Sequence, residues 1–378
     1  MTDTALADPE VGGEDNDSAE SSALAAGLRG LRLPTVAVGL AAVAGGILLI
    51  VSGENPLSVY WSILDESFLS GSGIGRTLEK ATPMVMGGLA VAFAFKAGLF
   101  NIGGQGQLLL GAAFAAWVGY NFDLPLVVHL PLAMVVGGLV AALLGAIVGA
   151  LKAYRGAHEV ITTIMFNFVA GNLTDYLVSR DGPWNDPDGG AIARTPRIRD
   201  SAIIPTYGDI PIGFFIACGF AFLIWWLLNK TTFGFEIVTT GANKHAARYA
   251  GIGVNRIIIL TMAISAFLAG IGGAIQSQGL FGRFEASNNA GLGFDGITIA
   301  LLARTNPIAV IPAAILIGGL NASTTRLQQD FRIEPEVVSI LQALILFFVA
   351  APSVVRWLVR WKAIGDEEAI QLTGGWGA

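Results

Sequence analysis

Ten stretches of the chain are apolar enough, or nearly so, to cross a lipid bilayer. A spanning helix needs about 20 predominantly apolar residues. The stretches cover approximately residues 34–52, 77–97, 105–121, 125–151, 159–179, 207–229, 256–280, 292–304, 307–328 and 334–359. The eighth is too short to span alone, so a count of ten requires it to be a partial or broken helix. The pattern predicts an all-α polytopic membrane protein with about ten transmembrane helices, some of them broken or short.

The stretch Gly98–Gln107 interrupts this pattern with glycines, one asparagine and two glutamines. Glycine weakens a helix by about 1 kcal/mol relative to alanine. Non-helical backbone at membrane depth persists only where it is buried in protein or lines a watery cavity. We therefore predict a helix break on the inner wall of a passage, opposite a second break near Gly291–Gly296. Two breaks, each followed by a helix rich in glycine and alanine, suggest pseudo-repeated halves around a shared pathway.

The distribution of lysine and arginine predicts that both termini are cytoplasmic, because basic residues are enriched in cytoplasmic loops. With ten crossings, 13 of the 22 basic residues fall inside and nine outside. Two loops are too long to be simple connectors. The outer loop, 180–207, combines prolines with paired charges and is predicted to be an ordered segment able to meet a docking partner. The inner loop, 231–256, is predicted to carry a short amphipathic helix over Lys244–Ala250, capped by Asn243 and ended by Gly251.

Composition agrees with a membrane protein and adds two tails. The chain is 53% hydrophobic and 13% charged, against about a quarter charged in soluble domains. Residues 1–28 hold seven acids and no base, which predicts a disordered cytoplasmic tail. The transmembrane domain is expected over 29–362 and a C-terminal cytoplasmic tail over 363–378. Without the acidic tail, 22 bases face 21 acids, so net charge says nothing about partners.

The first apolar run, Pro34–Val51, lacks a small-residue cleavage site and is interpreted as a retained anchor helix. The stretch Asn55–Phe68 after it carries Tyr60 and Trp61 and fits an interfacial helix. The single cysteine, Cys218, excludes an intramolecular disulfide and is expected to be a buried small hydrophobe.

No motif in the chain argues for catalysis. A phosphate-binding Gly-Lys-Ser/Thr loop is absent. The dinucleotide-type spacing Gly291–Gly296 follows a membrane span rather than a strand, so it is a chance match. The three histidines, at 129, 158 and 245, fall in separate segments, so no zinc helix is expected. The chain is predicted to hold no cofactor of its own.

Polar residues within the spans are the candidates for a solute pathway, because burying an unpaired amide or carboxyl in hydrocarbon costs several kcal/mol. They gather at the break, in the fifth span and in the short eighth segment. The alternative role, hydrogen bonding between helices, is common for amides and threonines in membranes, and both readings stay open. The predicted pathway residues are Asn101, Gln105, Glu159, Thr163, Asn167, Asp295 and Thr298. Close glycines, such as Gly145 with Gly149 and Gly270 to Gly273, are interpreted as helix packing.

Four motifs together resemble the permease subunits of bacterial ABC importers for nucleosides and simple sugars, within the larger group that includes ribose and branched-chain amino-acid permeases. They are Gly98-Leu-Phe-Asn-Ile-Gly-Gly-Gln-Gly-Gln107, His158-Glu-Val-Ile-Thr-Thr-Ile-Met-Phe-Asn167, Gly241-Ala-Asn-Lys-His-Ala-Ala-Arg-Tyr-Ala-Gly251 and Gly293-Phe-Asp-Gly-Ile-Thr-Ile-Ala-Leu-Leu302. The resemblance covers roughly residues 34–362. The acidic N-terminal tail is longer than the family requires.

The resemblance implies a multi-pass permease of the bacterial plasma membrane that is not itself an enzyme. Its expected partners are a second permease, two cytoplasmic ATPase domains that use ATP and Mg²⁺, and an external lipoprotein that delivers substrate. It further implies that the inner loop is the coupling helix seated in the ATPase, with contacts from Asn243, Lys244, Ala246, Ala247, Arg248 and Tyr249. A branched-chain amino-acid permease, or a secondary transporter without an ATPase, remains as an alternative.

Overall fold

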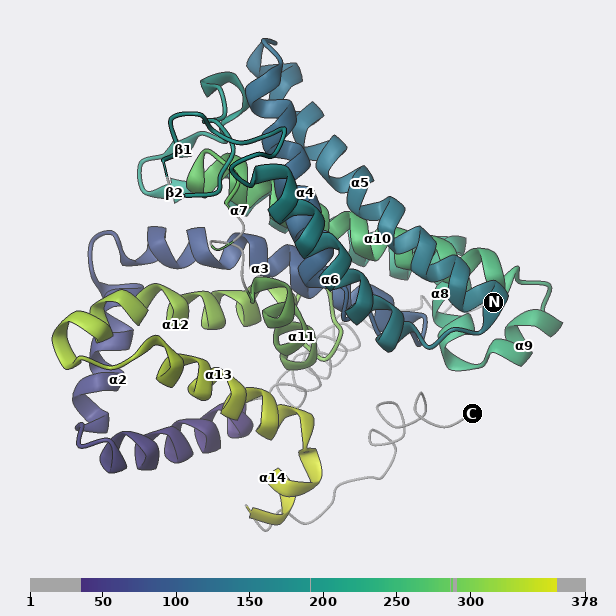
Figure 1. Ribbon diagram of the computed structural model, residues 1–378. Coiled ribbons are helices and arrows are strands. Elements are labelled where there is room, and N and C mark those ends of the chain that lie inside the picture. The colour runs from purple at the N-terminus through teal and green to yellow at the C-terminus, as the bar shows by residue number, and fades with distance from the viewer. Residues whose placement is uncertain (1–34, 191, 286, 288–290, 359–378) are drawn as a thin grey trace, which may run out of the picture.

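The computed structural model describes residues 35–190, 192–285, 287 and 291–358, and nearly all of its regular structure is helical (Figure 1). The predicted tails, 1–28 and 363–378, lie outside these residues. The first half contains the helix Thr35–Val51, α2 (Pro56–Leu64), the π-helical turn η1 (Asp65–Leu69), α3 (Gly73–Lys96), α4 (Gly104–Asn121), α5 (Leu126–Arg155), α6 (Glu159–Val178) and the 3₁₀ turn η2 (Asp200–Ala202). The prediction of helices is confirmed for the described residues of this first half.

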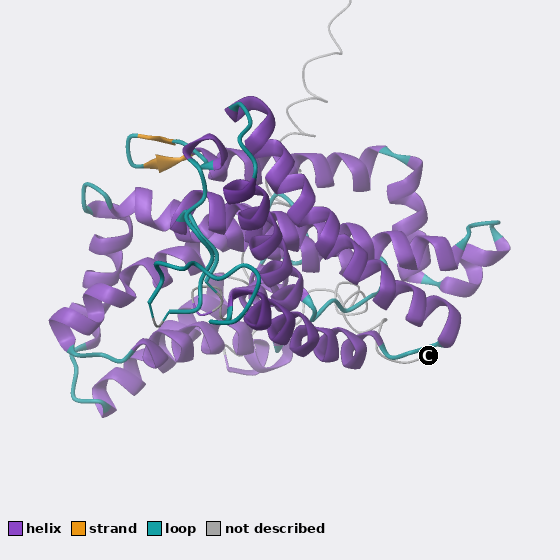
Figure 2. Cartoon of the chain, turned by 45° about the horizontal axis from the view of Figure 1, so that its top comes forward, coloured by secondary structure: helices purple, strands orange, loops and turns teal. Residues whose placement is uncertain are grey.

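The second half begins with a two-stranded hairpin and continues as helices. Its elements are β1 (Thr206–Tyr207), β2 (Ile210–Pro211), α7 (Ile212–Lys230), α8 (Thr232–Ala242), α9 (Lys244–Tyr249), α10 (Val254–Ile275), the π-helical turn η3 (Gln276–Phe281), α11 (Leu292–Leu302), α12 (Val310–Phe331), α13 (Pro335–Ala350) and α14 (Pro352–Leu358). The strands are antiparallel, with Thr206 opposite Pro211, and they are the small pair at one edge in Figure 2.

Five described helices, α3, α5, α7, α10 with its π turn, and α12, are long and apolar enough to cross a membrane. Three shorter apolar helices, Thr35–Val51, α11 and α13, accompany them. The helices α4 and α6 have spanning length, at 18 and 20 residues, and their glutamines, asparagines and acids lower their hydropathy. The chain is therefore a multi-pass helical membrane protein. The short eighth segment is confirmed: α11 has 11 residues, about 16 Å of helix against a bilayer core of about 30 Å.

Two segments differ from the expected pattern. The last predicted span, 334–359, is two helices separated at Ala351, because the residue before Pro352 is disfavoured in the helical conformation. The inner loop holds two helices rather than one. Thr231 caps the additional helix, α8, through its side-chain oxygen, which accepts from the N–H of Gly234 at 3.1 Å. A Ser or Thr cap before an apolar run is a helix start signal, so α8 has a local signal in the sequence at Thr231.

Close glycine contacts hold α4, α5 and α10 together. A Cβ on Gly111 of α4 would lie 2.2 Å from the carbonyl oxygen of Gly270, and one on Gly145 of α5 would lie 2.3 Å from that of Met262. These backbones therefore approach as closely as helices can, which confirms that the glycines serve packing. The three helices form a central layer; α3 packs on α10, and α11 packs mainly on α3 (Figure 1).

Replacing Gly111 with alanine is expected to lower the thermal midpoint of the detergent-solubilised protein. Alanine gains about 1 kcal/mol of helix propensity, but overpacking against fixed backbone costs about 1–3 kcal/mol. Gly219→Ala on α7 is the matched control, since a Cβ there meets nothing within 4 Å. Equal midpoints for the two variants, in a heating series with the wild-type chain, would contradict the packing role of Gly111.

The loop 180–207 makes specific contacts with the helices in its described residues. Trp184 stacks on Trp117 of α4 with ring centroids 6.0 Å apart. Asp186 pairs with Arg194 at 3.1 Å, and the N–H of Thr195 donates to the carbonyl of Phe284 at 3.0 Å. The loop and the hairpin lie at the opposite end of the bundle from α9 (Figure 1).

Candidate functional site

The predicted break is present between α3 and α4. Gly98 has φ +66°, and the N–H of Leu99 bonds back to the carbonyl of Ala94 at 3.1 Å. A left-handed glycine with such a backward bond is the usual helix stop. α4 begins at Gly104 and its first residues are buried, so α4 starts inside the protein.

Asn101 is the centre of the break. Its side chain is fully buried, and its Nδ2 donates to Oε1 of Gln107 at 2.9 Å and to Oγ of Ser265 at 2.8 Å. Its Oδ1 accepts from the N–H of Gly103 at 3.0 Å and from Nε2 of Gln107 at 3.1 Å. The hydroxyl of Ser265 passes the connection on to the carbonyl of Ala90 at 2.6 Å. One amide thus joins α3, α4 and α10.

Asn167 and Gln105 extend this network to α6 and α11. Oδ1 of Asn167 accepts from the N–H of Gly106 at 2.8 Å, and its Nδ2 donates to the carbonyl of Ile102 at 2.9 Å. Asn101 and Asn167 therefore satisfy N–H groups at the start of α4, which have no partner within the helix. Oε1 of Gln105 accepts from the N–H of Gly293 at 2.9 Å, so the starts of α4 and α11 meet.

We call this set of side chains the α4 junction; it comprises Asn101, Gln105, Gln107, Asn167 and Ser265. It brings together three of the predicted pathway residues and adds Ser265, which the sequence reasoning did not single out. A serine within an apolar helix is a weak signal, because its hydroxyl often bonds its own helix. The amides have protein partners, and contact with solute stays a prediction.

The other predicted pathway residues lie around the junction. Thr163 is fully buried beside Gly103 and donates to the carbonyl of Glu159 at 2.7 Å. Thr298 is nearly buried on α11. Glu159 lies apart, at the first residue of α6, where its carboxylate pairs with Nζ of Lys152 on α5 at 2.8 Å. Their part in a pathway stays a prediction.

Exchanging Lys152 and Glu159 separates a structural from a pathway role for Glu159. Glu159→Lys alone places two like charges together and is expected to reduce the amount of protein in the membrane. Adding Lys152→Glu restores the pair, so recovery of both protein level and uptake is the expected result for a structural ion pair. Recovery of the protein level without uptake would instead support the pathway role. Immunoblots of membranes and uptake by the same cells provide the two measurements.

Asp295, the predicted carboxylate of the eighth segment, is half-buried on α11 and lies beside the side chain of Asn321 on α12. Oδ1 of Asn321 accepts from Nε2 of Gln342 on α13 at 2.7 Å. The sequence reasoning missed Asn321 and Gln342, although an amide within an apolar span is the same signal that selected Asn167. The structure brings the three residues together from three helices.

The helix predicted for the inner loop is confirmed as α9. Oδ1 of Asn243 accepts from the N–H groups of His245 and Ala246 at 2.9 and 3.0 Å, and Gly251 follows the helix with φ +82°. Tyr249 is 94% exposed. Of the predicted contact residues only Ala247 is buried, at 0% exposure, so it packs under the helix while the others are available to a partner.

The segment before α9 touches the break itself. A Cβ on Gly241, near the end of α8, would lie 2.2 Å from the carbonyl oxygen of Lys96 and 2.9 Å from the backbone nitrogen of Gly98. The two backbones are therefore in direct contact, with no side chain between them. Displacement of α8 and α9 would act directly on the residues that lead into the α4 junction.

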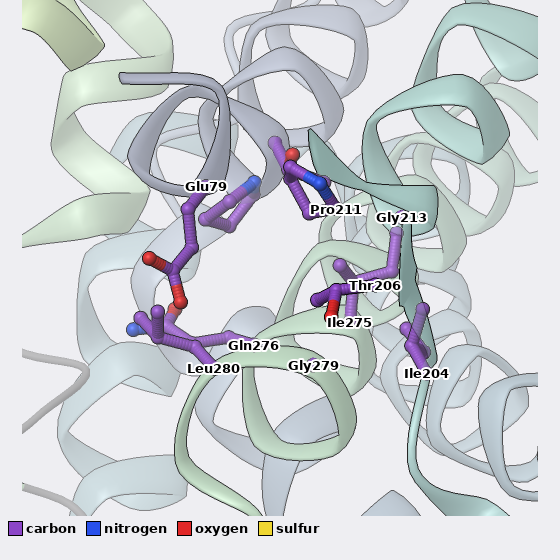
Figure 3. Close-up of a pocket in the computed structure, with 11 residues that line it drawn as sticks. Glu79, Ile204, Thr206, Pro211, Gly213, Ile275, Gln276, Gly279 and Leu280 are labelled. Atoms are coloured by element: carbon purple, nitrogen blue, oxygen red, sulfur yellow. The ribbon is translucent and has the colours of Figure 1, made fainter. Parts of the chain in front are cut away.

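A separate small pocket lies under the hairpin and is lined by α3, α7, α10 and η3. It encloses about 380 Å³, including the space at its mouth. Glu79 extends toward Gln276 on one side, facing Pro211 and Gly213 on the other (Figure 3). The hairpin, which supplies Thr206 and Pro211 to the lining, lies at the opposite end of the bundle from α9 (Figure 1).

Comparison with known proteins identifies the family. Residues 73–350 match the branched-chain amino acid transport system permease component. The chain belongs to this permease family. It is 38% identical over 333 residues to the guanosine ABC transporter permease protein NupP of Bacillus subtilis, which covers 87% of this chain and 95% of the relative. No solved structure matches.

Two further relatives show the breadth of the group. The nucleoside ABC transporter permease protein NupB of Lactococcus lactis is 32% identical over 357 residues, covering 92% of this chain and 98% of the relative. The glucose ABC transporter permease protein TsgB13 of Haloferax volcanii is 32% identical over 358 residues, covering 90% and 93%. Bacillus subtilis and Lactococcus lactis each have a second, more distant permease relative, at 26% identity to this chain. The match to permeases named for nucleosides and sugars confirms the resemblance drawn from the four motifs.

Proposed function

We propose that this permease forms half of the translocation pathway for a nucleoside or a simple sugar, imported at the expense of ATP hydrolysed by a partner chain. The observation that carries the proposal is the match, along most of the chain, to permeases named for guanosine, nucleosides and glucose. The exposed α9 and its contact with the break support the ATP-driven mechanism, because an importer must transmit closure of its ATPase to the pathway.

The proposal has a definite topology. Ten crossings, with α4, α6 and the short α11 among them, place both termini and α9 on the cytoplasmic side of a bacterial plasma membrane. The hairpin and the loop 180–207 then lie outside, where a substrate-binding lipoprotein would dock. A second permease completes the pathway; paired permease relatives in two organisms support a heterodimer. ATP and Mg²⁺ belong to the partner ATPase.

The alternatives fit less well. A branched-chain amino-acid solute is a zwitterion, for which Asp295 supplies only one sign of charge. The exposed, capped helix α9 offers a surface for a partner such as an ATPase, and the relatives are named as ABC permeases.

Uptake by a deletion strain tests the proposed function. Cells lacking this chain, and the same cells with it restored, receive radiolabelled guanosine, ribose, glucose or leucine at equal concentrations. The expected result is restored uptake of guanosine or of one of the sugars, accompanied by copurification of an ATPase and a second permease with the tagged chain. Restored uptake of leucine alone would support the amino-acid alternative, and uptake that survives depletion of ATP would contradict the ATP-driven mechanism.

A further inference from the structure

Three helices bring one carboxyl group and two amides together in the second half of the bundle. Asp295 lies on α11, Asn321 on α12 and Gln342 on α13; we call them the α11–α13 polar cluster. Nε2 of Gln342 donates to Oδ1 of Asn321 at 2.7 Å, and the side chain of Asn321 lies beside the carboxylate of Asp295. The hydrogen bond from Gln342 orients Asn321, and Asn321 in turn limits where the side chain of Asp295 can lie.

The cluster lies at the middle of the spanning helices. Gly296, next to Asp295, has its Cα within contact distance of Gly87, which is central in the 24-residue helix α3. Nδ2 of Asn321 lies 4.0 Å from Sδ of Met84 in the same part of α3. A membrane embedding these helices would therefore place the cluster near its midplane.

The exposed part of Asp295 needs a polar neighbour. The residue is only half-buried, and within the described part of the chain no basic side chain lies within ion-pair distance of it. A charged carboxylate facing hydrocarbon at this depth would cost several kcal/mol, and acids in spans almost always face the protein interior or a watery cavity. The exposed side of the carboxylate therefore fits a watery pathway better than lipid.

We propose that Asp295 accepts hydrogen bonds from ring hydroxyls of the passing solute, with Asn321 and Gln342 as positioning residues. This inference rests on the proposed function and assigns to it a recognition chemistry. A carboxylate offers about four acceptor sites, more than Asn321 occupies, and two adjacent hydroxyls of a sugar ring match its paired oxygens. The hydroxylated ring is the feature that a nucleoside and a hexose share. A neutral solute forms no ion pair there, so it can also be released.

An experiment that changes both Asp295 and the solute hydroxyls tests the contact between them. It is designed so that the solute preference of the lipoprotein does not affect the result. Uptake of guanosine and of 2′,3′-dideoxyguanosine is measured in cells with the complete transporter, carrying either the wild-type chain or Asp295→Asn. Each solute is used at a concentration that saturates uptake. We expect Asp295→Asn to lower guanosine uptake about tenfold, the loss expected for one hydrogen bond to a charged acceptor, and to change uptake of the dideoxy analogue less than twofold.

For each solute, uptake by the variant is compared with uptake by the wild-type chain, so the solute preference of the lipoprotein cancels. Equal loss for the two solutes, at unchanged protein level in the membrane, would overturn the contact and indicate that Asp295 pairs with the second permease. Gln342→Leu is expected to lower guanosine uptake less than Asp295→Asn does, with the same selectivity, and Gln342→Asn to restore part of it. A wild-type chain that imports neither guanosine nor glucose would overturn the proposed function and this inference together.

Discussion

Replacing both Ala246 and Arg248 with glutamate is expected to lower uptake at least about tenfold while the protein stays in the membrane. Both residues are exposed on α9, the helix we assign to the ATPase contact. A charge reversal on a recognition surface can cost several kcal/mol, and each 1.4 kcal/mol is a tenfold change in binding. Uptake of radiolabelled solute and an immunoblot of the membrane fraction measure the two effects.

The matched control reverses a charge elsewhere at the same end of the bundle. Arg155, at the end of α5, is exposed, and Arg155→Glu is expected to leave uptake within about twofold. Ala247→Glu is a different case, because that side chain is fully buried and the variant should lose protein from the membrane. Normal uptake by the Ala246→Glu, Arg248→Glu variant would refute the assignment of α9.

The contact between Gly241 and Gly98 gives the coupling a physical route. Movement of α8 and α9 would act on the backbone at Gly98, and from there on Asn101, which bonds residues of α4 and α10. The route is short and passes through backbone atoms, which transmit displacement better than flexible side chains. The α4 junction would respond as a unit, because its amides bond each other and helix ends.

Replacing Asn101 with leucine is expected to remove most of the folded protein from the membrane. The substitution leaves the buried amide of Gln107 and the N–H of Gly103 without a partner that Asn101 now supplies. Each buried polar group left unsatisfied costs about 1–3 kcal/mol, and proteins have only about 5–15 kcal/mol of stability in total. Size-exclusion chromatography of the solubilised protein and its thermal midpoint measure the loss.

Asn172→Leu is the matched control on α6. Asn172 is exposed and its side chain donates only to the carbonyl of Phe168, one turn earlier in its own helix, at 2.7 Å. Its loss is therefore expected to change stability by less than about 0.5 kcal/mol. If Asn101→Leu were as stable as Asn172→Leu, the hydrogen-bond network of the junction would not hold the break together.

Much of the fold could be predicted because the start and end of each helix are signalled by residues close by in the sequence. The stop at Gly98, the cap at Asn243 and the end at Gly251 are all signals of one or two residues, and all three are confirmed. The additional helix α8 has the same kind of signal at Thr231, within a loop that was expected to hold only one helix. The division of the last span at Ala351 follows from Pro352 and could likewise have been predicted.

The partners of the site residues could not be predicted, since they depend on contacts between distant segments. Nothing local to Gln105 indicates that it accepts from Gly293, 188 positions later. The sequence identified Asn101 and Asn167 as unusual but could not distinguish a helix cap from a pathway contact, because both need a buried amide. The grouping of Asp295, Asn321 and Gln342 likewise depends on the packing of three helices.

Transport by purified components tests the central claim most directly. The chain is reconstituted in proteoliposomes with its second permease and ATPase, with the loaded lipoprotein outside the vesicles and ATP with Mg²⁺ inside. The account predicts accumulation of a labelled nucleoside or sugar against its gradient, dependent on ATP and abolished by glutamates at Ala246 and Arg248. Equal accumulation without ATP, or with the α9 variant, would contradict it.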